Sequence, residues 1–476
     1  MRRALVWWFT LSASAACASP PLAAPALSPR RAASTPAAPE YMPTEPIEPV
    51  VAPFGMPQPT RPKIPARVFD IREFGAVEGG RQKVTVAFRR AITRATAAGG
   101  GTVLVPPGRW LTGPIHLASN INLHVSAGAT LLFSQTFADY LPPVLTRWEG
   151  QELYGYSPLI YARDCENVAI TGGGTLDGQG AAWWPWKQTQ HAAAAKLYDA
   201  VLAGVPTAQR VFADEGGLRP SFIQTVACKN VLIEGITLTS GPFWTIHPVY
   251  SENVIVRRVR VQTSGPNNDG CDPDSSRNVL IEDSFFSTGD DCVVIKSGLN
   301  EDGWRVAKPS ENIVVRRLHG EAGHGGVVIG SEMSGGVRNV WVSDSDFVGT
   351  DRGLRIKSMR GRGGSIENVF YENVRHSKLR LTVVELTSSY DSSTLQPKSL
   401  TPPSMRGIHV KNVSAQGAQR AIDISGLAEQ PIRDVSFEHV RIESEQGLRA
   451  VACENIHFKD VILESPAGET FLTKDW

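Results

Sequence analysis

Two adjacent carboxylates, Asp290 and Asp291, stand in the stretch "FFSTGDDCVVIKSG" between a glycine and an apolar run. Adjacent acids repel each other and are costly to remove from water, so an isolated "GDD" is most often a solvated turn before a strand. About twenty residues earlier, "GPNNDGCDPDSS" carries a third carboxylate, Asp269. Three such groups can perform general acid–base chemistry on one bond if the fold brings the two stretches together.

Further reactive side chains follow in two later stretches. His324 lies beside glycines in "GHGGVVIGS", and Arg355 and Lys357 lie in "RGLRIKS". Residues i and i+2 of a strand share a face, so both cations are expected to project the same way, with Ile356 between them in the core. A single histidine is more often structural, and an Arg-x-Lys pair is usually a solvated face. The joint occurrence is therefore what indicates a site.

A repeated phrase predicts the element that positions these groups. Each copy is a polar residue, an asparagine and a short β-branched strand, and copies lie mostly about 20 to 35 residues apart: "ENVAITG", "KNVLIEG", "ENVIVRR", "RNVLIED", "ENIVVRR", "RNVWVSD", "ENVFYEN", "KNVSAQG" and "ENIHFKD". Repeats of this period, with no helical pattern between them, indicate a solenoid. We predict an all-β fold, a single-stranded right-handed parallel β-helix. The asparagine suits a turn, because it tolerates left-handed dihedrals and its amide can stack on the next coil.

Stacking of coils turns the separate stretches into one candidate site. Neighbouring strands lie about 4.8 Å apart, and the paired phrases "NNDGC" and "TGDDCVVI" place Asp269 one coil from Asp290 or Asp291. That distance lies within the range over which two acids can act on one bond. The histidine and the two cations follow on the next coils, so three acids, one imidazole and two cations are expected in one patch.

The ends of the chain predict export and a capped solenoid. Residues 1–18, in "MRRALVWWFTLSASAACASP", are predicted to be a signal peptide because the apolar run is too short for a membrane anchor. Cys17 is an alternative lipid-anchor cysteine, but Ser14 stands where a large aliphatic residue is expected. Residues 19–67 are Pro- and Ala-rich, which predicts a flexible tether. In the remaining domain, 68–476, "VTVAFRRAITRATAAGG" predicts a short N-terminal capping helix.

Composition restricts the class of partner. The chain has 48 basic and 47 acidic side chains, so a nucleic-acid binder with a dominating basic face is not indicated, whereas a local cationic cleft remains compatible. Once Cys17 is removed, the five remaining cysteines are an odd number, which argues against a full disulfide framework. Cys165, Cys228 and Cys453 share a C-x-N pattern, which favours apolar packing in the core over a metal site.

The motifs carry a family resemblance. "NND", "GDD", "GHG" and "RIK", in this order and spacing, resemble the signature of the polygalacturonases, family 28 of the glycoside hydrolases. From about Phe69 to the C-terminus, stretches such as "EFGAV", "LTRWEGQELYGYSPLIYA" and "FWTIHPVY" are similar to the bacterial, exo-type branch. One departure is Asn268, where many members have threonine; we expect the chemistry to be retained.

The resemblance implies an inverting hydrolysis of α-1,4-glycosidic bonds between galacturonic acid residues. In it Asp290 is the general acid, Asp269 and Asp291 hold and deprotonate a water, and His324 hydrogen-bonds within this network. Clustered acids raise one another's pKa, which is expected to keep a proton on Asp290. The acid and base carboxyls are expected about 6.5 to 9.5 Å apart, so that a water fits between them.

The resemblance also implies substrate-binding residues. Arg355 and Lys357 are expected to pair with the uronic acid carboxylate at the cleavage point, and Asn267 and Tyr390 are further substrate-binding candidates. No metal or cofactor is required. The expected partner is a pectic polysaccharide or an oligogalacturonide, without nucleic acid or a membrane span, and the protein is expected to be a secreted or periplasmic monomer.

Two insertions favour exo action on that polymer. The segment before Ser157 and residues 178–221, which interrupt the repeat, contribute four tryptophans that are expected to wall off one end of the cleft and stack on sugar rings: Trp148, Trp183, Trp184 and Trp186. The alternative is that these are ordinary loops whose tryptophans pack on the solenoid. For the whole protein, the alternatives are a rhamnogalacturonan or xylogalacturonan hydrolase, a pectate lyase on the same fold, and a non-catalytic β-helix adhesin.

Overall fold

The computed structural model describes residues 41–390, 401–466 and 471–475. The predicted signal peptide, Cys17 and the first part of the predicted tether, residues 19–40, lie outside the described residues. Residues 40–476 form one unit. Among the described residues, no helix is both long enough and apolar enough to cross a membrane.

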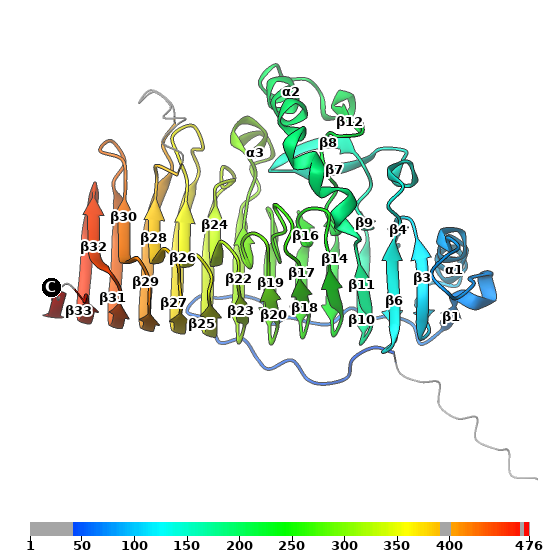
Figure 1. The fold of residues 1–476 in the computed structure, drawn as a ribbon, viewed down its shortest axis with the longest axis horizontal. Helices are drawn as coiled ribbons and strands as arrows, with labels where there is room; N and C mark the ends of the chain where they lie inside the picture. The colour runs from blue at the N-terminus through cyan, green and yellow to red at the C-terminus, as the bar shows by residue number, and fades with distance from the viewer. Residues whose placement is uncertain (1–40, 391–400, 467–470, 476) are drawn as a thin grey trace, which may run out of the picture. The chain divides into compact units, whose positions relative to one another are not determined.

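The body of this unit is a stack of coils whose strands pair in parallel from one coil to the next (Figure 1). The prediction of a parallel β-helix is therefore confirmed. The larger, 21-stranded sheet is called the outer sheet here; its strands are β1 (Val68–Asp70), β2 (Gly101–Val105), β3 (Gly108–Thr112), β5 (Ile121–Val125), β6 (Ala129–Phe133), β10 (Glu166–Gly172), β11 (Thr175–Asp177), β14 (Lys229–Glu234), β15 (Thr237–Thr239), β17 (Glu252–Arg257), β18 (Arg260–Gln262), β19 (Arg277–Glu282), β20 (Phe285–Ser287), β22 (Ser310–Arg316), β23 (His319–Glu321), β25 (Val337–Val348), β27 (Ser365–Ser377), β29 (Ser404–Gln416), β31 (Ile432–Glu443), β33 (Cys453–Glu464) and β34 (Phe471–Asp475).

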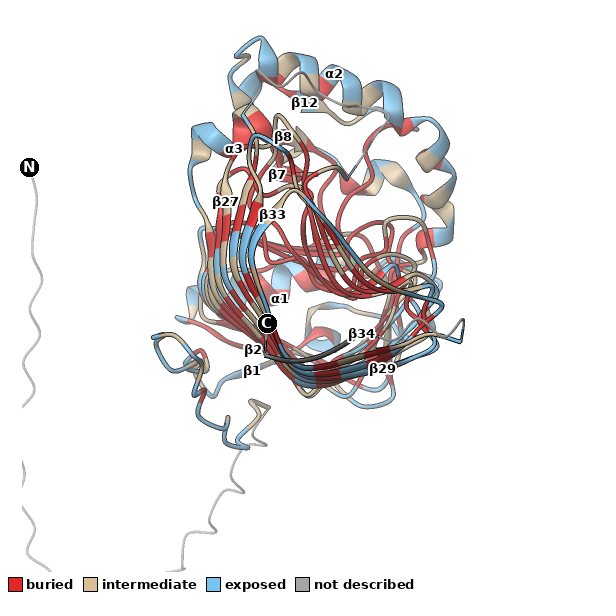
Figure 2. Ribbon diagram, turned by 90° about the vertical axis from the view of Figure 1, so that its left-hand side faces the viewer, coloured by how far each residue is buried: buried red, intermediate tan, exposed pale blue. Residues whose placement is uncertain are grey.

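A second row of strands faces the outer sheet across the core and is called the cleft sheet here. It has a four-stranded part, β4 (Ile115–His116), β9 (Ile160–Arg163), β13 (Ile223–Val226) and β16 (Ile246–Val249), and a six-stranded part, β21 (Val293–Ile295), β24 (Gly325–Gly330), β26 (Arg352–Lys357), β28 (Thr382–Thr387), β30 (Arg420–Ser425) and β32 (Gln446–Val451). Isolated bridges through Cys271 and Asp274 connect the two parts. Seen along the axis, buried residues fill the space between the sheets (Figure 2).

Register explains why the repeated phrase folds in this way. Val231, Val254, Val279 and Ile313 occupy the same position of β14, β17, β19 and β22, and all four are buried in the central core. The β-branched side chains of neighbouring coils thus pack on one another, because alternate residues of a strand point to the same face. The periodic pattern in the sequence arises because these inward positions recur once in every coil.

The repeated asparagines form ladders at a turn, as the sequence predicts. Asn278, Asn312, Asn339 and Asn368 all have positive φ angles between 55° and 58°. The side-chain amides of Asn312, Asn339 and Asn368 each donate to the asparagine of the preceding coil, at 3.0, 3.0 and 3.2 Å. Asparagine satisfies both needs of the position, a left-handed backbone and a hydrogen-bonding partner on each side.

The predicted capping helix is α1 (Thr85–Ala97), which packs against β1 and β2 of the first coil. It buries Phe88, Ala91, Ile92 and Ala95, whereas Val86 is exposed. At the other end, β33 pairs with β34 in antiparallel orientation, unlike the strands of the coils. Both ends of the described stack therefore differ from the repeating coil, as a solenoid requires.

Residues 41–67 do not behave as the flexible tether that the sequence predicts. They run in an extended course along the outer sheet (Figure 1), where Val50 packs on Leu280 and Val314. Arg316 donates to the main-chain carbonyl of Glu48 at 2.8 Å, and other main-chain oxygens of the segment accept in the same way. The prediction needs correction here, because the outer sheet carries outward apolar side chains that this segment covers.

The insertions form a lobe above the cleft sheet (Figures 1 and 2). Its three-stranded sheet consists of β7 (Val144–Trp148), β8 (Gln151–Gly155) and β12 (Val211–Phe212), and its helix is α2 (Gln190–Leu202). The lobe contacts α3 (Asn300–Val306), where Asp302 accepts from the main-chain N–H of Glu152 at 2.7 Å and pairs with Arg210 at 2.9 Å. These buried contacts fix the lobe to the coil that follows β21.

Candidate active site

The cleft sheet brings the predicted residues together by its register. The bridge between Cys271 and Val293 sets Asp269 beside Asp291, and the main-chain N–H of His324 donates to the carbonyl of Asp290 at 3.0 Å. In β26, Leu354 and Ile356 belong to the core, so Arg355 and Lys357 face the cleft. The motifs lie on consecutive coils, and this explains their spacing in the sequence.

The three carboxylates form one cluster. One oxygen of each of Asp269, Asp290 and Asp291 lies within 4.8 Å of the others. Asp269 and Asp291 sit in register on adjacent strands, whose separation is about 4.8 Å, and Asp290 directly precedes Asp291 in the chain, so the backbone brings all three together.

Asp290 and His324 form a hydrogen-bonded pair. Nδ1 of His324 lies 3.0 Å from Oδ1 of Asp290, and the same oxygen accepts from the main-chain N–H of Asp291 at 3.0 Å. Burial raises the pKa of Asp290, but the His324 hydrogen bond and the positive charges of His324, Lys357 and Lys296 outweigh it, so the pKa is lowered. The expectation that neighbouring acids keep the proton on Asp290 is therefore wrong for the substrate-free site. The Asp290 hydrogen bond in turn raises the pKa of His324.

The more buried members of the acid cluster have raised pKa values. Burial, followed by the charges of Asp290 and Asp272, raises the pKa of Asp269 well above its ordinary value. Burial raises the pKa of Asp272 likewise. Oδ1 of Asp269 is buried and has no hydrogen-bond partner among the described residues. The pKa values of neighbouring acids are therefore shifted in opposite directions, upward for Asp269 and downward for Asp290.

The two predicted cations face the cluster from β26. Nζ of Lys357 pairs with Oδ2 of Asp291 at 2.9 Å, and Nε of Arg355 pairs with Glu385 at 2.7 Å. Ile356 lies between them in the core, as predicted. Tyr390 covers both cations, with its ring centroid 5.1 Å from the Arg355 guanidinium carbon and 5.2 Å from Nζ of Lys357. The structure thus brings the tyrosine candidate into the site.

Asn267 lies at the edge of the same cavity. Its side-chain oxygen accepts from Nη2 of Arg219 at 2.7 Å, which ties the site to the inserted segment. Burial lowers the pKa of Arg219 to about 10. The neighbouring Asn268 is buried and donates to the carbonyls of Gly241 and Phe243 at 3.0 and 3.1 Å. Asn268 therefore supports the loop and has no access to the cavity.

Several residues of the site are missing from the sequence prediction. Nζ of Lys296 pairs with Glu332 at 2.8 Å and lies 4.5 Å from the ring centroid of Trp244. All three line a cavity of about 270 Å³ together with the predicted acids, Asn267, Lys357 and Tyr390. Lys296 has a signal in the sequence, because it is two residues beyond the outward Val294 of "VVIKS". Glu332 and Trp244 lie outside the strands and have no such signal.

The three acid oxygens are close enough to share one divalent cation. In this structure the ammonium groups of Lys296 and Lys357 already supply positive charge to the cavity. Carboxylates flanked by cations suit proton transfer next to an anionic group. The arrangement can therefore protonate one side of a bond, activate water on the other side and bind a carboxylate.

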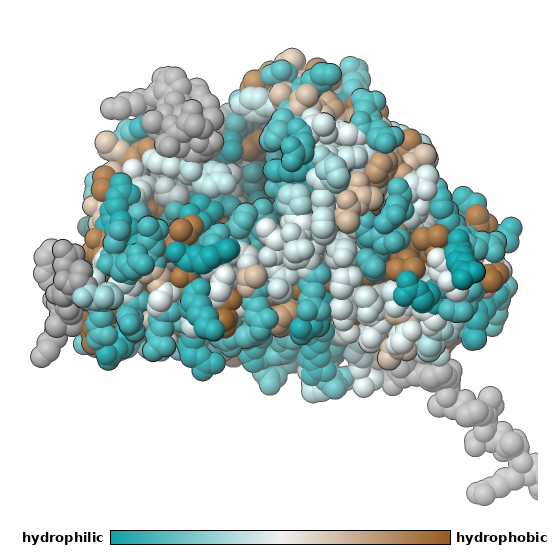
Figure 3. All heavy atoms as spheres, in the orientation of Figure 1, coloured by the Kyte–Doolittle hydropathy of each residue, from teal (hydrophilic) through white to brown (hydrophobic). Residues whose placement is uncertain are grey.

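The tryptophans of the insertions pack within the protein, which is the alternative that the sequence left open. Trp183 is fully buried and packs on Trp186, Tyr140 and Tyr156. Trp148 is 5% exposed and stacks on Phe243. Nε1 of Trp184 donates to the carbonyl of Gly241 at 2.9 Å. The expected stacking of sugars on Trp183 and Trp186 is wrong, although the lobe that they stabilise does stand beside the cleft, where the surface is recessed (Figure 3).

Comparison with known proteins places the chain in a family. The family model described as glycosyl hydrolases family 28 matches residues 206–465. A probable polygalacturonase from Vitis vinifera is 30% identical over 384 residues, covering 78% of this chain and 73% of that protein. An exo-poly-alpha-D-galacturonosidase from Dickeya chrysanthemi is 28% identical over 413 residues, covering 78% of this chain and 66% of that protein.

A solved structure agrees with these relatives. The hyperthermoactive exopolygalacturonase from Thermotoga maritima superposes with a TM-score of 0.83 at 41% identity, covering 88% of this chain and 96% of that one. The residues that the family model matches include all the acids, the histidine and the cations of the cluster. The chain belongs to family 28 of the glycosyl hydrolases and is a glycoside hydrolase.

Proposed function

We propose that this hydrolase cleaves α-1,4-glycosidic bonds between galacturonate residues of polygalacturonate, with inversion and from a chain end. The observation that carries the proposal is the joint placement of three carboxylates and Lys357 at one cavity, with Arg355 against the ring of Tyr390, which lines that cavity. Acids alone suit any glycosidic bond, whereas the cations suit a sugar that carries a carboxylate. The relatives, a probable polygalacturonase and an exopolygalacturonase, support the same substrate.

Asp290 is the proposed general acid, and His324 is its partner. The hydrogen bond between Nδ1 of His324 and Oδ1 of Asp290 holds one proton. Transfer of that proton to the carboxylate leaves a neutral imidazole, and Asp290 then protonates the leaving glycosidic oxygen. The raised pKa of His324 keeps a proton on the His324–Asp290 pair up to a higher pH than a free imidazole would allow.

Asp269 and Asp291 are proposed to hold and deprotonate the attacking water. Oδ1 of each is buried without a hydrogen-bond partner among the described residues, so each has an acceptor to offer. Lys357, paired with Asp291, stabilises the ionised form of that carboxylate. For Asp269 to act as the base it must be ionised, and the positive charge of Lys296 favours that form.

Substrate binding is assigned to the cationic side of the cavity. Arg355 and Lys357 bind the carboxylate of the galacturonate at the cleaved bond, Arg355 with a planar fork and Lys357 as a point charge. Tyr390, which lies over both cations, supplies a face for the sugar ring. Asn267 offers its amide at the opposite edge of the cavity.

Exo action is supported by the lobe, which closes one side of an otherwise open groove. The lobe is held by buried charges, because Arg147 pairs with Asp274 at 3.1 Å beneath it. A polymer that must lie across the groove on both sides is thereby hindered, whereas a chain end can enter. Viscosity measured against reducing-sugar release tests this directly: exo action predicts a slow viscosity fall, and a rapid fall at low conversion would establish internal cleavage.

Product analysis on polygalacturonate tests the reaction itself. We expect saturated galacturonate products, and proton NMR of the first-formed reducing end should show the inverted anomer. Retained configuration would overturn the roles of Asp269 and Asp291. Unsaturated products absorbing near 235 nm would indicate a lyase, binding without turnover would indicate an adhesin, and selective cleavage of rhamnogalacturonan or xylogalacturonan would assign a different pectic substrate.

The location and state of the protein are part of the proposal. We propose that residues 1–18 direct export, that the mature protein acts as a secreted or periplasmic monomer on cell-wall pectin, and that residues 68–476 are the catalytic domain. The support is the N-terminal sequence pattern. N-terminal sequencing of the exported protein tests it; a lipid on Cys17, or an uncleaved N-terminus, would contradict it.

A further inference from the structure

Two cysteines lie in register on neighbouring coils, at the turn that leads from the cleft sheet to the outer sheet. Strand β9 pairs with β13 before this turn and β10 pairs with β14 after it, so Cys165 and Cys228 lie opposite each other. The main-chain N–H of Lys229 donates to the carbonyl of Cys165 at 2.9 Å. Neighbouring strands lie about 4.8 Å apart, which is within the range of about 4.4 to 6.8 Å that a disulfide spans between Cα atoms.

The two side chains have the same surroundings on their own coils. Each cysteine follows a left-handed residue, Asp164 with a φ of 54° and Ala227 with a φ of 52°. Each Sγ lies near the carbonyl oxygen two residues earlier, at 3.1 Å for Cys165 and 3.5 Å for Cys228. Both thiols are free in this structure. Rotation about the Cα–Cβ bonds is therefore the movement that brings the two sulfurs together.

The following coils show that this turn does not require cysteine. In register with Cys228, the next three coils have Ser251, Ser276 and Ser310. Each of these hydroxyls accepts from the main-chain N–H at the same position of the preceding coil, at 3.3, 3.0 and 3.2 Å. Serine thus satisfies the hydrogen bond of the position. In this row cysteine stands on two adjacent coils, where two sulfurs can react with each other.

The two thiols differ in acidity and in access. A hydrogen bond with the Cys228 thiol lowers the pKa of Cys165 to about 7, against the effect of burial. The same hydrogen bond, together with burial, raises the pKa of Cys228. Cys165 is half-buried between the exposed residues Asp164 and Glu166, whereas Cys228 is fully buried. Because the thiolate is the nucleophile in disulfide exchange, Cys165 is the thiol that an oxidant reaches first.

Cys453 provides a matched control. It has the same C-x-N pattern and is also half-buried. It lies in register with Ile432 of β31, so the neighbouring coil offers it no thiol. Burial raises its pKa. Position in the sequence pattern is thus shared by the three cysteines, whereas a thiol on the neighbouring coil and a lowered pKa are not shared by Cys453.

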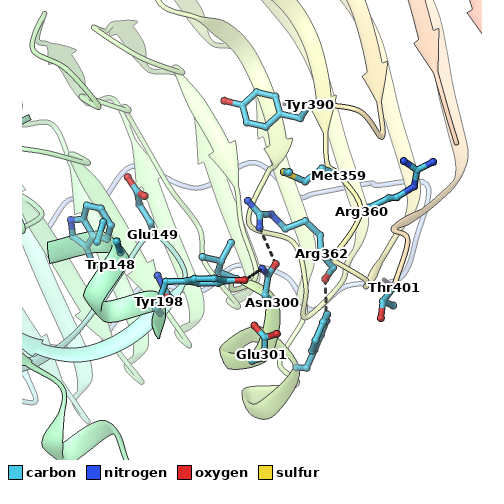
Figure 4. A pocket seen from close by; sticks show the side chains of 16 residues that line it. Trp148, Glu149, Tyr198, Asn300, Glu301, Met359, Arg360, Arg362, Tyr390 and Thr401 are labelled. Carbon is cyan, nitrogen blue, oxygen red and sulfur yellow. Dashed lines mark hydrogen bonds between the residues drawn. The ribbon is translucent and has the colours of Figure 1, made fainter. Parts of the chain in front are cut away.

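The chain between the two cysteines contains the larger insertion, residues 178–221. Helix α2 of this insertion forms one wall of a cavity of about 610 Å³, which shares lining residues such as Glu149 and Arg362 with the catalytic cavity (Figure 4). In Figure 4 Tyr198 of α2 and Asn300 of α3 point toward each other, and Nδ2 of Asn300 donates to the Tyr198 hydroxyl at 3.3 Å. A bond between the cysteines would close the loop that carries this wall.

We propose that Cys165 and Cys228 are a redox pair that closes to a disulfide and clamps two neighbouring coils at the base of the lobe. The oxidant is an organic disulfide, small or protein-borne. The Cys165 thiolate attacks one of its sulfurs, the S–S bond of the oxidant breaks, and the other sulfur leaves as a thiolate. Cys228 then loses its proton to solvent and attacks the sulfur of Cys165, and the second sulfur of the oxidant leaves. The two cysteines are oxidised by two electrons, and the oxidant is reduced to two thiols.

The test oxidises the reduced, purified protein with oxidised glutathione, alkylates the remaining thiols and maps the peptides by mass spectrometry. We expect a linked peptide of Cys165 and Cys228 that disappears on reduction, and no link to Cys453. The thermal midpoint should rise by roughly 2 to 5 °C on oxidation, because a disulfide that closes a long loop restricts the unfolded chain. Cys165→Ser, which has the side chain of the following coils, should lose both the link and the rise. Cys453→Ser should keep both.

Each result decides the inference. Alkylation of both Cys165 and Cys228 after oxidation would overturn it, and so would oxidation that stops at glutathione bound to Cys165. A link to Cys453, or a thermal midpoint that does not rise, would contradict the clamp. The peptide map is made on the unsubstituted protein, so it stands even if a serine variant fails to fold. Hydrolysis of polygalacturonate by the same samples reports separately on the proposed function, which this inference does not need.

Discussion

Two rows of ionisable side chains cross neighbouring coils, one on the outer sheet and one on the cleft sheet. On the outer sheet Glu234, Arg257, Glu282 and Arg316 stand in register on β14, β17, β19 and β22. Their signs alternate, and the ion pairs measure 3.2, 3.0 and 2.7 Å from one coil to the next. All four side chains are buried. The two inner charges, Arg257 and Glu282, are therefore matched from both sides.

The cleft row places like charges where the outer row places opposite ones. Asp269 and Asp291 stand in register, and Asp290 adds a third carboxylate to the same space. Burial and neighbouring acids raise the pKa of Asp269, and the ammonium of Lys357 pairs with only one of the three carboxylates, that of Asp291. The same stacking of coils thus produces a structural ladder where the charges on neighbouring coils alternate in sign. It produces a reactive site where those charges have the same sign.

The largest effect is expected in the cleft row. Asp290→Asn removes the proposed proton donor without changing the shape of the side chain, so kcat should fall about 100- to 10,000-fold. The thermal midpoint should hardly change, because the coil core is untouched. Asp283→Asn, an aspartate of the outer face paired with Arg317, is the matched control and should keep full activity. Near wild-type turnover of Asp290→Asn would contradict the acid assignment.

The outer row should show the opposite pattern. Glu282→Gln removes the charge shared by Arg257 and Arg316 and leaves two buried guanidinium groups without it. Breaking a buried ion pair in this way should lower the free energy of unfolding by about 3 to 5 kcal/mol. Activity per folded molecule should remain.

Denaturant unfolding and kcat of the purified protein check this pattern together. The control is Glu311→Gln, whose partner Arg338 is exposed, and which should cost at most about 1 kcal/mol. If Glu282→Gln lowered kcat as strongly as Asp290→Asn does, the division between the two rows would fail.

The third prediction concerns pH and lies within the cleft row. His324 is the main cause that lowers the pKa of Asp290 against the effect of burial. His324→Ala removes the imidazole whose raised pKa keeps a proton on the pair. Proton uptake then rests on Asp290 alone, beside the charges of Lys357 and Lys296, so the high-pH limb of the kcat/KM profile should move to lower pH. His319→Ala, which alters a histidine paired with Asp346 away from the cluster, should leave the limb in place. A limb that stayed in place or moved to higher pH would contradict the role of His324 in holding the proton.

The repeating part of the molecule could be predicted from the sequence because each coil has the same demands. Asparagine at a left-handed turn and β-branched residues at inward positions recur in every copy, so their spacing gives both the fold and the register. Asp269, Asp290, His324 and Lys357 could be placed for the same reason, since register brings them together.

The rest of the fold and of the site depends on contacts that leave no periodic pattern in the sequence. Glu149 and Arg362 reach the site from a hairpin and a loop, where position is set by tertiary packing. The proton distribution among the acids depends on burial, which reverses the expectation for Asp290. Residues 41–67 have the composition of a linker, yet they pack because the outer sheet exposes apolar side chains to them.

The smallest effect is expected where a ladder carries no net charge. Asn312 lies in the middle of its ladder, accepts from Asn339 and donates to Asn278, both at 3.0 Å, and has a φ of 56°. Asn312→Gly keeps the left-handed backbone and loses only the two hydrogen bonds. Asn312→Ala loses the hydrogen bonds and adds a left-handed penalty of about 1 to 2 kcal/mol, so it should be the less stable variant by that amount. Denaturant unfolding of both proteins measures the difference, and kcat should be unchanged in both. Equal stability of the two variants would show that the ladder serves through its amide contacts alone, whereas a loss comparable to that of Glu282→Gln would mean that neutral and charged ladders stabilise the coils alike.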